Sequence, residues 1–394
     1  MKVALDYTTG IYPGAGIARY TRSLVSALAE IDSENSYALF YAARGLPRDT
    51  PEWRQAQKLF AEHGRLHPVA VPLSVRQMFA VWQRLRIPLP VDLFTGKCDI
   101  MHSPDFVSPP HRTGADVVTV HDLSFLVMPE CAEPKLASFL GKTVPAAVRR
   151  ADHVVAVSQQ TADDLTRLLD VPDRKITVAY NGVDKRFRLM AVEALRTMPG
   201  RLRSKLPGPG AKIILHVGTL EPRKNLVRLV QAYGLVTSEK RVSGEVVLLL
   251  AGRKGWLYEP ILEAAERVRR SGGNVVFLDY VYDEDLPLLY NKASVFAYPS
   301  LYEGFGLPAA EALACGVPTL VSKDGALAEV VGSAALSVEA RSVEDIAAGL
   351  ERLLLDDALR QRLAVEGPEQ ASKFTWEAAA RTVLSVYSTA AAGI

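Results

Sequence analysis

The sequence predicts an α/β protein with two domains, each built on a parallel β-sheet that is covered by helices. Short apolar runs rich in β-branched residues alternate with longer helical patterns along the whole chain. The runs are continuously apolar, which is typical of strands that are buried on both faces. In addition, a chain of 394 residues is too long for one ordinary hydrophobic core.

Six runs in the first half of the chain predict strands, namely KVALDY (2–7), YALFYA (37–42), CDIMHS (98–103), DVVTVHD (116–122), HVVAVS (153–158) and KITVAY (175–180). Five more follow in the second half, namely KIILHVG (212–218), VVLLLAG (246–252), NVVFLDY (274–280), SVFAYPS (294–300) and VPTLVS (317–322). Residues 186–211 mix charge with proline and glycine, which is the composition of a linker. We therefore expect an N-terminal domain at 1–185 and a C-terminal domain at 212–374.

A last helical pattern, FTWEAAARTVLSVY, begins at Phe374. Thr375 is predicted to be its N-cap, because a threonine hydroxyl can accept a hydrogen bond from the first turn. Glu377 lies early in that turn, where a carboxylate suits the positive end of a helix.

The composition excludes several classes of protein. Hydrophobic residues make up 48% and charged residues 23%, the balance of a soluble globular protein, and the net charge of +2 is too small to favour nucleic acid as a partner. Cys98, Cys131 and Cys315 lie far apart, which argues against a disulfide framework or a zinc site. Asp6 interrupts the first apolar run, and no uncharged stretch approaches the roughly 18 residues of a membrane span. We expect a cytoplasmic protein without a signal peptide.

The segment GTLEPRKN (218–225) follows a predicted strand and precedes a helical pattern. Ligands of parallel α/β sheets bind beyond the carboxyl ends of the strands, so this segment is a candidate binding loop. Gly218 allows a ligand to approach the backbone, and Arg223 and Lys224 lie where a helix N-terminus adds partial positive charge. We interpret the pair as a phosphate site, with an ordinary solvated loop as the alternative.

The segment EGFGLPAAEALACG (303–316) carries two carboxylates around a helix start. Pro308 suits the first turn of a helix, which places Glu303 in the preceding loop and Glu311 about one turn inside. Carboxylates accept hydrogen bonds from vicinal hydroxyls, so the two acids suit a sugar and a ribose at opposite ends of a diphosphate. Capping and solvation of a helix end is the alternative interpretation.

Two features of the first half are weaker signals. His121 ends a predicted strand, where a neutral imidazole could bind a sugar hydroxyl or simply pack. Gly14 and Gly16 lie in the glycine-rich segment GIYPGAGIARY and fit a loop that approaches phosphate. The segment does not complete the G-x-G-x-x-G fingerprint, so it gives little support for NAD.

Five segments form a recognisable set, namely HD (121–122) after a first-half strand, NGVD (181–184), PRKN (222–225) after a strand and the dipeptide GT, EGFGLPAAE (303–311) and the terminal FTWEAAA (374–380). Together they resemble the family 4 retaining glycosyltransferases. The resemblance covers nearly the whole chain and is strongest over 212–330. It implies the GT-B fold, which consists of two Rossmann-like domains whose parallel sheets face each other across a central cleft. It also implies that the helix at 375–394 packs back onto the N-terminal domain.

The resemblance implies a role for each matching residue. Arg223 and Lys224 would hold the donor diphosphate, Glu303 would lie at the donor sugar, Glu311 would bind the ribose, and the main chain at Val281 would meet the base. Further donor contacts would come from Gly16, Gly218, Phe305, Gly306 and Leu307. His121 would contact the donor sugar near the reacting carbon.

The implied reaction moves a hexose from a nucleotide diphosphate sugar to a saccharide, with retention of configuration. No Asp-x-Asp motif ends a predicted strand, so we expect neither a metal nor a cofactor. The segment HDLSFLVMPE (121–130) resembles bacterial polysaccharide mannosyltransferases, which favours GDP-mannose and surface polysaccharide biosynthesis. UDP-glucose and other donors remain alternatives, as does a non-catalytic nucleotide-sugar sensor. A phosphorylase is less favoured, because no clear lysine site for pyridoxal phosphate is visible.

The acceptor is expected at the N-terminal domain. The stretch SVRQMFAVWQRLRIPL (74–89) places apolar residues at helical spacing and surrounds them with Arg76, Arg84 and Arg86. Such a stretch can lie on an anionic membrane surface or can be an ordinary helix packed on a sheet. If it meets the bilayer, a lipid-linked saccharide acceptor and a peripheral location on the inner face of the cell membrane follow.

Overall fold

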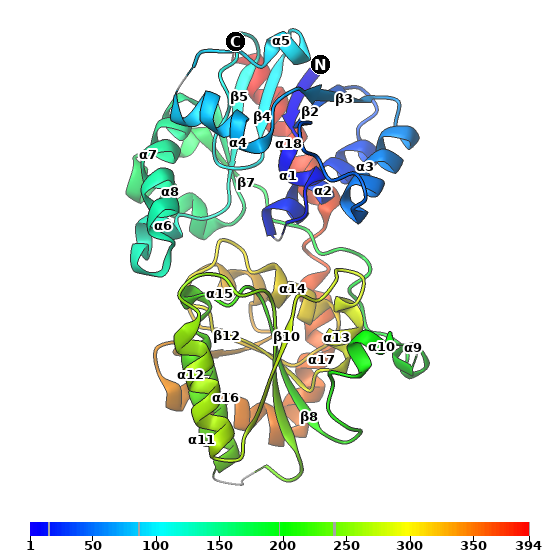
Figure 1. The fold of residues 1–394 in the computed structure, drawn as a ribbon, viewed down its shortest axis with the longest axis vertical. Helices are drawn as coiled ribbons and strands as arrows, with labels where there is room; N and C mark the ends of the chain where they lie inside the picture. The colour runs from blue at the N-terminus through cyan, green and yellow to red at the C-terminus, as the bar shows by residue number, and fades with distance from the viewer. Residues whose placement is uncertain (15, 86, 197, 239–241, 394) are drawn as a thin grey trace. The chain divides into compact units, whose positions relative to one another are not determined.

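The computed structural model describes residues 1–14, 16–85, 87–196, 198–238 and 242–393. The chain divides into two compact units (Figure 1). The first unit comprises Met1–Leu123, Lys135–Gly182 and Thr375–Ile394, and the second comprises Ser124–Pro134 and Val183–Phe374. Arg86, which the sequence placed in the basic stretch, lies outside the described residues.

The first unit is built on a seven-stranded sheet in the order β3-β2-β1-β4-β5-β6-β7, and every pair of neighbouring strands is parallel. The strands are β1 (Lys2–Asp6), β2 (Ser36–Ala42), β3 (Leu66–Val71), β4 (Ile100–Ser103), β5 (Ala115–Val120), β6 (His153–Ala156) and β7 (Ile176–Val178). The chain starts in the middle of the sheet, builds to one edge and then returns past β1 to build the other. In open α/β sheets, ligands bind at the carboxyl ends of the strands where the strand order reverses, which in this sheet is between β1 and β4.

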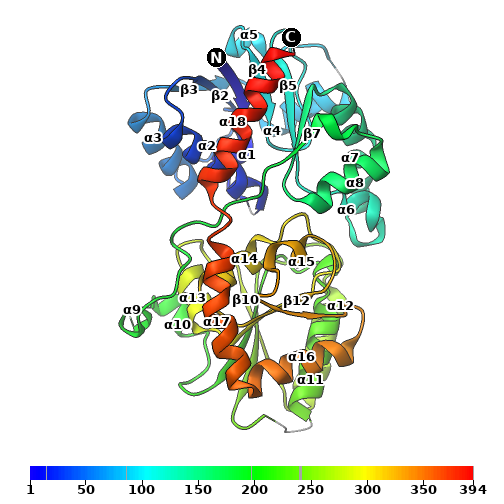
Figure 2. The same cartoon turned by 180° about the vertical axis from the view of Figure 1, so that it is seen from behind.

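The helices of the first unit are α1 (Thr8–Ile11), α2 (Gly16–Ile31), α3 (Pro51–Glu62), α4 (Val75–Met78), α5 (Asp92–Thr95), α7 (Pro134–Arg150), α8 (Gln159–Leu169) and α18 (Trp376–Ala392). A π-helical turn (Phe79–Arg84) continues α4, and a 3₁₀ turn (Asp173–Lys175) precedes β7. The C-terminal α18 packs against α2 and β5 (Figure 2). Its N-cap was predicted correctly, because the Thr375 side chain accepts a hydrogen bond from Ala378 N at 3.1 Å.

The second unit is built on a six-stranded parallel sheet in the order β10-β9-β8-β11-β12-β13. The strands are β8 (Lys212–Val217), β9 (Val246–Ala251), β10 (Asn274–Asp279), β11 (Val295–Tyr298), β12 (Thr319–Ser322) and β13 (Leu336–Val338). Its helices are α6 (Ser124–Val127), α9 (Val192–Arg196), α10 (Gly200–Arg203), α11 (Leu226–Ser238), α12 (Glu259–Arg270), α13 (Leu286–Lys292), α14 (Leu307–Ala314), α15 (Ala326–Val331), α16 (Val343–Leu355) and α17 (Asp357–Ala371). Short 3₁₀ turns cover Pro129–Cys131 and Pro222–Lys224.

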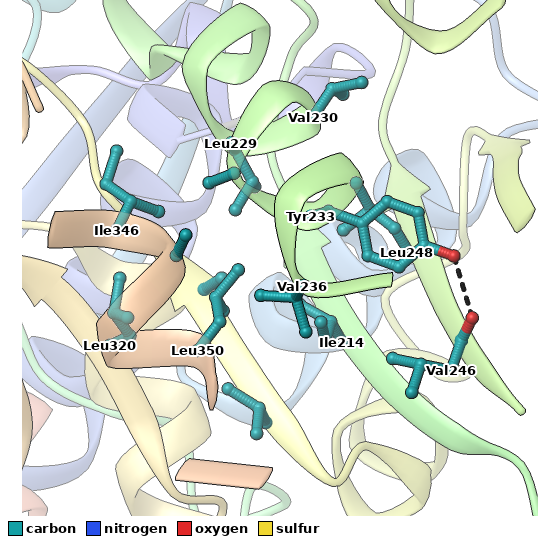
Figure 3. Packing of buried hydrophobic residues seen from close by; sticks show 14 of the residues in the cluster. Ile214, Leu229, Val230, Tyr233, Val236, Val246, Leu248, Leu320, Ile346 and Leu350 are labelled. Atoms are coloured by element: carbon teal, nitrogen blue, oxygen red, sulfur yellow. Dashed lines mark hydrogen bonds between the residues drawn. The ribbon is translucent and has the colours of Figure 1, made fainter. Parts of the chain in front are cut away.

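Both faces of the second sheet are buried. Ile214 belongs to a core cluster with α11 and α16, whereas its neighbours Ile213 and Leu215 belong to a separate cluster. Tyr233 of α11 lies in the first cluster and donates a hydrogen bond to Val246 O at 2.8 Å (Figure 3). Two buried faces explain why the runs are continuously apolar. The predicted fold class, two α/β units with parallel sheets, is confirmed.

The structure differs from the sequence prediction in three places. The strands β3 and β13 were not predicted. Residues 186–211, interpreted as a linker, contain α9 and α10 and bury Phe187, Met198 and Leu202 in a core of the second unit. Residues 124–134 pack with the second unit, although the sequence on both sides of them belongs to the first.

A search of the described residues finds no helix with the length and apolar character that a membrane crossing requires.

Candidate active site

The loop after β8 carries the two cations that the sequence assigned to phosphate. At its start, the backbone of Gly218 passes directly over Gly252 at the end of β9. A Cβ on Gly252 would lie 1.8 Å from Gly218 O, so a larger residue cannot fit there. The 3₁₀ turn Pro222–Lys224 then presents Arg223 and Lys224 beyond the carboxyl end of the sheet.

Glu303 lies between these cations. Arg223 Nη1 donates to Glu303 Oε2 at 2.8 Å, and Lys224 Nζ donates to Glu303 Oε1 at 2.6 Å. Arg223 Nη2 donates to Glu221 Oε1, also at 2.8 Å, and Nη1 donates in addition to Tyr302 O at 2.8 Å. The structure therefore brings together Arg223, Lys224 and Glu303, and it adds Glu221, which the sequence analysis missed.

This charge cluster is buried, since Glu221 is 3% exposed and Lys224 and Glu303 are each 7% exposed. Burial alone would raise the pKa of Glu303, but the charges of Arg223 and Lys224 outweigh it and lower the pKa to about 2. Burial, reinforced by Arg223, lowers the pKa of Lys224. Two cations thus face two carboxylates, and an incoming anion would compete with Glu303 for them.

Two aromatic residues support Lys224 from beneath. Lys224 Nζ donates to Tyr298 Oη at 2.7 Å and lies 5.0 Å from the centre of that ring. Tyr298 in turn stacks on His216 of β8, with 5.2 Å between ring centres. Burial lowers the pKa of His216 to about 4, so this imidazole is neutral near pH 7. The neutral His216 therefore supports Tyr298, and through it the Lys224 ammonium, without adding another buried charge.

Asn225 joins three loops at the carboxyl edge of the sheet. Its backbone is left-handed (φ 60°), a conformation that asparagine tolerates better than most residues. Its Nδ2 donates to Pro299 O at 3.0 Å and to Ala340 O at 2.6 Å, so the loops after β8, β11 and β13 are held together. Leu301 N also donates to Arg223 O at 2.9 Å. The charge cluster therefore rests on a cross-braced backbone.

The helix α14 begins where the sequence predicted, with Pro308 in its first turn. Gly306 is the residue before the helix and has a left-handed φ of 93°, and a Cβ on it would lie 2.3 Å from Leu327 Cδ2. Phe305 is buried and packs edge-on against Phe374. Leu307 is the first residue of the helix and is partly exposed.

Glu311 lies inside α14, on a different element from Glu303. It is 3% exposed and accepts a hydrogen bond from Tyr290 Oη of α13 at 3.0 Å. The predicted base contact, Val281, follows β10 and is partly exposed. Next to it, Tyr280 lies edge-on to Tyr282 and packs under Arg253 at 4.2 Å from the ring centre. Arg253, Val281 and Glu311 follow the carboxyl ends of β9, β10 and β11.

The other two predicted site residues belong to the first unit. His121 directly follows β5, and its Nε2 donates to Pro104 O at 2.7 Å. Burial lowers the pKa of His121, against the opposing effects of that carbonyl and of Asp122. Tyr20 and Phe106 pack edge-on against its ring. Gly16 begins α2 and is exposed, with open space where a Cβ would point.

Sequence reasoning missed Glu221, Tyr298 and Asn225. Glu221 and Asn225 lie in the same GTLEPRKN segment as the cations, so their position was a usable signal. Tyr298 is 74 residues from Lys224, and no local pattern reveals that contact. In the part of the chain that the structure describes, no three His, Cys, Asp or Glu side chains group so that they could hold a metal ion.

Comparisons with known proteins identify the family of the chain. Residues 201–370 match the family described as "Glycosyl transferases group 1", and residues 14–187 match "Glycosyltransferase Family 4". The chain is 33% identical to O-antigen chain mannosyltransferase B of Escherichia coli over 379 residues, which covers 95% of this chain and 96% of the relative.

Two solved structures share the fold. Sucrose-phosphate synthase of Thermosynechococcus elongatus superimposes with a TM-score of 0.75 at 21% identity, covering 100% of both chains. Anabaena Alr3699/HepE, solved in complex with UDP and glucose, gives a TM-score of 0.70 at 18% identity, covering 99% of this chain and 100% of that one. At these identities the likeness concerns the fold alone.

Proposed function

The chain belongs to the family 4 glycosyltransferases, and from this premise we propose that it transfers mannose from GDP-mannose to a saccharide acceptor with retention of configuration. One observation carries the proposal: Arg223 and Lys224 are held side by side by Glu303 in a buried cluster at the carboxyl edge of the second sheet. A leaving nucleoside diphosphate carries several negative charges. Fixed cations in a poorly solvated site stabilise that charge without reorganising.

The remaining roles follow the positions of the side chains. Glu303 would bind the donor sugar once the diphosphate has taken over its two cations, and Glu311 would bind the ribose. Main chain at Phe305, Gly306 and Leu307 would meet the sugar and phosphate, and main chain at Val281 would meet the base. Gly16 and His121 would contribute from the first unit. His121 suits a hydrogen bond to a sugar hydroxyl, because its lowered pKa keeps it neutral.

We propose that the reaction needs neither a metal nor a cofactor. Arg223 and Lys224 supply two positive charges at the expected diphosphate, which is the electrostatic task that a divalent cation performs in other enzymes. Transfer that survives excess EDTA would support this assignment, and transfer that is lost with EDTA and restored by Mn²⁺ would contradict it.

The donor sugar is inferred from the mannosyltransferase of Escherichia coli that the chain resembles over nearly its full length. That relative also suggests a role in O-antigen or similar surface polysaccharide biosynthesis. UDP-glucose is the second candidate, since the structural neighbour from Anabaena was solved with UDP and glucose.

The acceptor is proposed to be a lipid-linked saccharide at an anionic membrane surface. The stretch 74–89 packs Met78 and Trp82 into a core of the first unit, while Val75, Phe79 and Leu85 are 43%, 43% and 64% exposed. Exposed apolar side chains beside Arg76 and Arg84 suit the interface of anionic lipids. Binding to anionic but not to neutral liposomes at low salt would support this assignment, and indifference to both would contradict it.

The donor is tested by thermal shift with GDP, UDP and dTDP, followed by transfer of radiolabelled mannose. A ligand at about 100 times its Kd adds about 2.7 kcal/mol to the unfolding free energy, so the correct nucleotide should raise Tm the most. Intact GDP-mannose after long incubation with acceptor would favour the non-catalytic sensor instead.

Lys224 is tested by substitution. Lys224→Ala should lower transfer at least about 100-fold, in line with the loss of one transition-state contact. Lys212→Ala is the matched control, because Lys212 lies at the opposite end of β8, where its Nζ donates to Leu354 O at 3.4 Å. Full activity in Lys224→Ala would remove the diphosphate assignment.

A further inference from the structure

Residues 124–134 form a segment that leaves the first unit and packs on the second. The segment begins three residues after His121 and returns to the first unit at α7. Phe125, Met128 and Cys131 are buried. Its polar anchor is Trp256, whose Nε1 donates to Cys131 O at 2.7 Å.

The loop that carries Trp256 is hydrogen-bonded to the loop after β8, which carries Arg223 and Lys224. Leu220 N donates to Arg253 O at 2.9 Å, and Gly255 N donates back to Leu220 O at 3.0 Å. A Cβ on Gly255 would lie 2.7 Å from Thr219 Cγ2, so the two loops are in close contact. Trp256 therefore connects the segment 124–134 to the loop that carries Glu221 and Arg223.

The backbone of Leu257, which follows Trp256, is strained, so the surrounding structure must hold this loop in place. Its φ of 52° is left-handed, which leucine rarely adopts, and its side chain is 52% exposed. Burial of the side chain does not compensate for the strain. Strained residues of this kind concentrate at functional sites, where the surrounding structure holds them in place.

The charges of the loop after β8 act on Cys131 of the segment. Burial and Glu130 raise the pKa of the Cys131 thiol, whereas the charges of Arg223 and Arg341 oppose that rise. The charge of Glu221 also raises the pKa of the Cys131 thiol. The electric field at Cys131 therefore includes the charges that the donor diphosphate is proposed to neutralise.

We propose that Trp256 is a positioning residue for the donor site, because its hydrogen bond holds the segment 124–134 against the Glu221–Arg223 loop and so fixes that loop for diphosphate. This inference rests on the proposed function, since it assumes that Arg223 and Lys224 bind diphosphate. The indole acts through the loop and touches no reacting atom.

The test compares Trp256→Phe with Trp82→Phe in the full-length chain. Trp82 Nε1 donates to Leu89 O at 2.9 Å in the first unit, so both variants lose one indole–carbonyl hydrogen bond. Binding of inorganic pyrophosphate, GDP and UDP is measured by calorimetry. We expect Trp256→Phe to weaken pyrophosphate binding about fivefold, the equivalent of one lost hydrogen bond, and Trp82→Phe to leave it unchanged.

The outcomes distinguish a failure of the proposed function from a failure of the positioning role of Trp256. Wild-type protein that binds none of the three ligands overturns the proposed function and this inference with it. Wild-type binding together with equal affinities in Trp256→Phe and Trp82→Phe overturns this inference and leaves the proposed function intact.

Two further measurements distinguish positioning from simple stabilisation. Leu257→Gly relieves the left-handed strain and loosens the loop, so Tm should hold or rise while pyrophosphate affinity falls. Affinity that stays constant in this variant would contradict the proposal, even if Trp256→Phe does not fold.

Pyrophosphate should also slow alkylation of Cys131 in wild-type protein, measured on its peptide by mass spectrometry. The same labelling should be faster and less sensitive to pyrophosphate in Trp256→Phe, and unchanged rates in both proteins would count against the proposal.

Discussion

Glu303→Gln separates two roles of this carboxylate, the ion pairs that the structure shows and the donor-sugar contact that we propose. In the free protein Glu303 pairs with the buried Lys224 and the partly exposed Arg223, and a glutamine of the same shape cannot neutralise them. The pKa of Glu303 is lowered from 4.5 to about 2 in the folded protein. This difference corresponds to about 3 kcal/mol of folding free energy at neutral pH. For a unit of this size, that loss should lower the melting temperature of the second unit by about 6–12 °C.

The sign of the pH dependence follows from the lowered pKa. Stability contributed by Glu303 is present above its unfolded-state pKa near 4.5 and is lost as the pH falls toward about 2. Calorimetric scans between pH 7 and pH 2 should therefore show a steeper acid loss in wild-type protein than in Glu303→Gln. The control is Glu339→Gln, which removes the same charge from an exposed ion pair with Lys323, where both side chains are solvated. That control should cost less than about 1 kcal/mol.

The affinity for pyrophosphate should rise in Glu303→Gln, although the stability of this variant falls. Glu303→Gln frees Arg223 and Lys224 from their internal anion, so pyrophosphate should bind more tightly than in wild-type protein and should restore much of the lost stability. Transfer activity should nevertheless fall, because the proposed sugar contact is altered. Equal stability losses in Glu303→Gln and Glu339→Gln, or weaker pyrophosphate binding in Glu303→Gln, would refute the idea that Glu303 occupies the diphosphate's place.

Two other substitutions test single features. Gly306→Ala and Gly316→Ala place a Cβ at left-handed positions on opposite ends of α14, so each should cost about 1–3 kcal/mol by thermal unfolding. Only Gly306→Ala should weaken pyrophosphate binding, and equal affinity in the two variants would argue against a donor site at that helix start. Tyr387→Phe removes the partner that lies 2.6 Å from the buried His102 Nδ1, so the first unit should lose about 1–3 kcal/mol with pyrophosphate affinity unchanged. An unchanged melting temperature would show that α18 is held by apolar packing alone.

Most strands that the sequence predicted share one physical property. Strands such as β8 and β9 are buried on both faces, so their sequences are continuously apolar and easy to recognise. The strand β3 lies at the edge of its sheet, contains Pro68 and exposes His67, so its sequence carries no such run. The strand β13 has three residues, too few to give a pattern. The edge strands β7 and β10 were predicted because their sequences are apolar, whereas the edge strands β3 and β13 were missed because they lack a recognisable apolar run.

The site was predictable to the extent that it follows the strands. Arg223, Lys224 and Glu303 were identified because each lies in a polar segment after an apolar run. The contact between Lys224 and Tyr298 depends on the pairing of β8 with β11, which no local signal specifies. The assignment of residues 124–134 to the second unit likewise depends on long-range contacts, such as the hydrogen bond from Trp256 to Cys131. Sequence order alone placed that segment in the wrong unit.

The arrangement of charge around Glu303 is better explained by binding than by stability. A buried ion pair is often no more stabilising than well-packed apolar residues of similar volume, because both ions must be desolvated. The loops after β8 and β11 nevertheless gather two cations and two carboxylates in one cluster, in which Lys224 and both carboxylates are buried, on a backbone cross-braced by Asn225. A cluster retained for folding alone would gain little from placing two like charges side by side. Under the proposed function, the cluster exchanges one internal carboxylate for a diphosphate, which requires adjacent cations and requires Glu303 to hold them in position until the donor arrives.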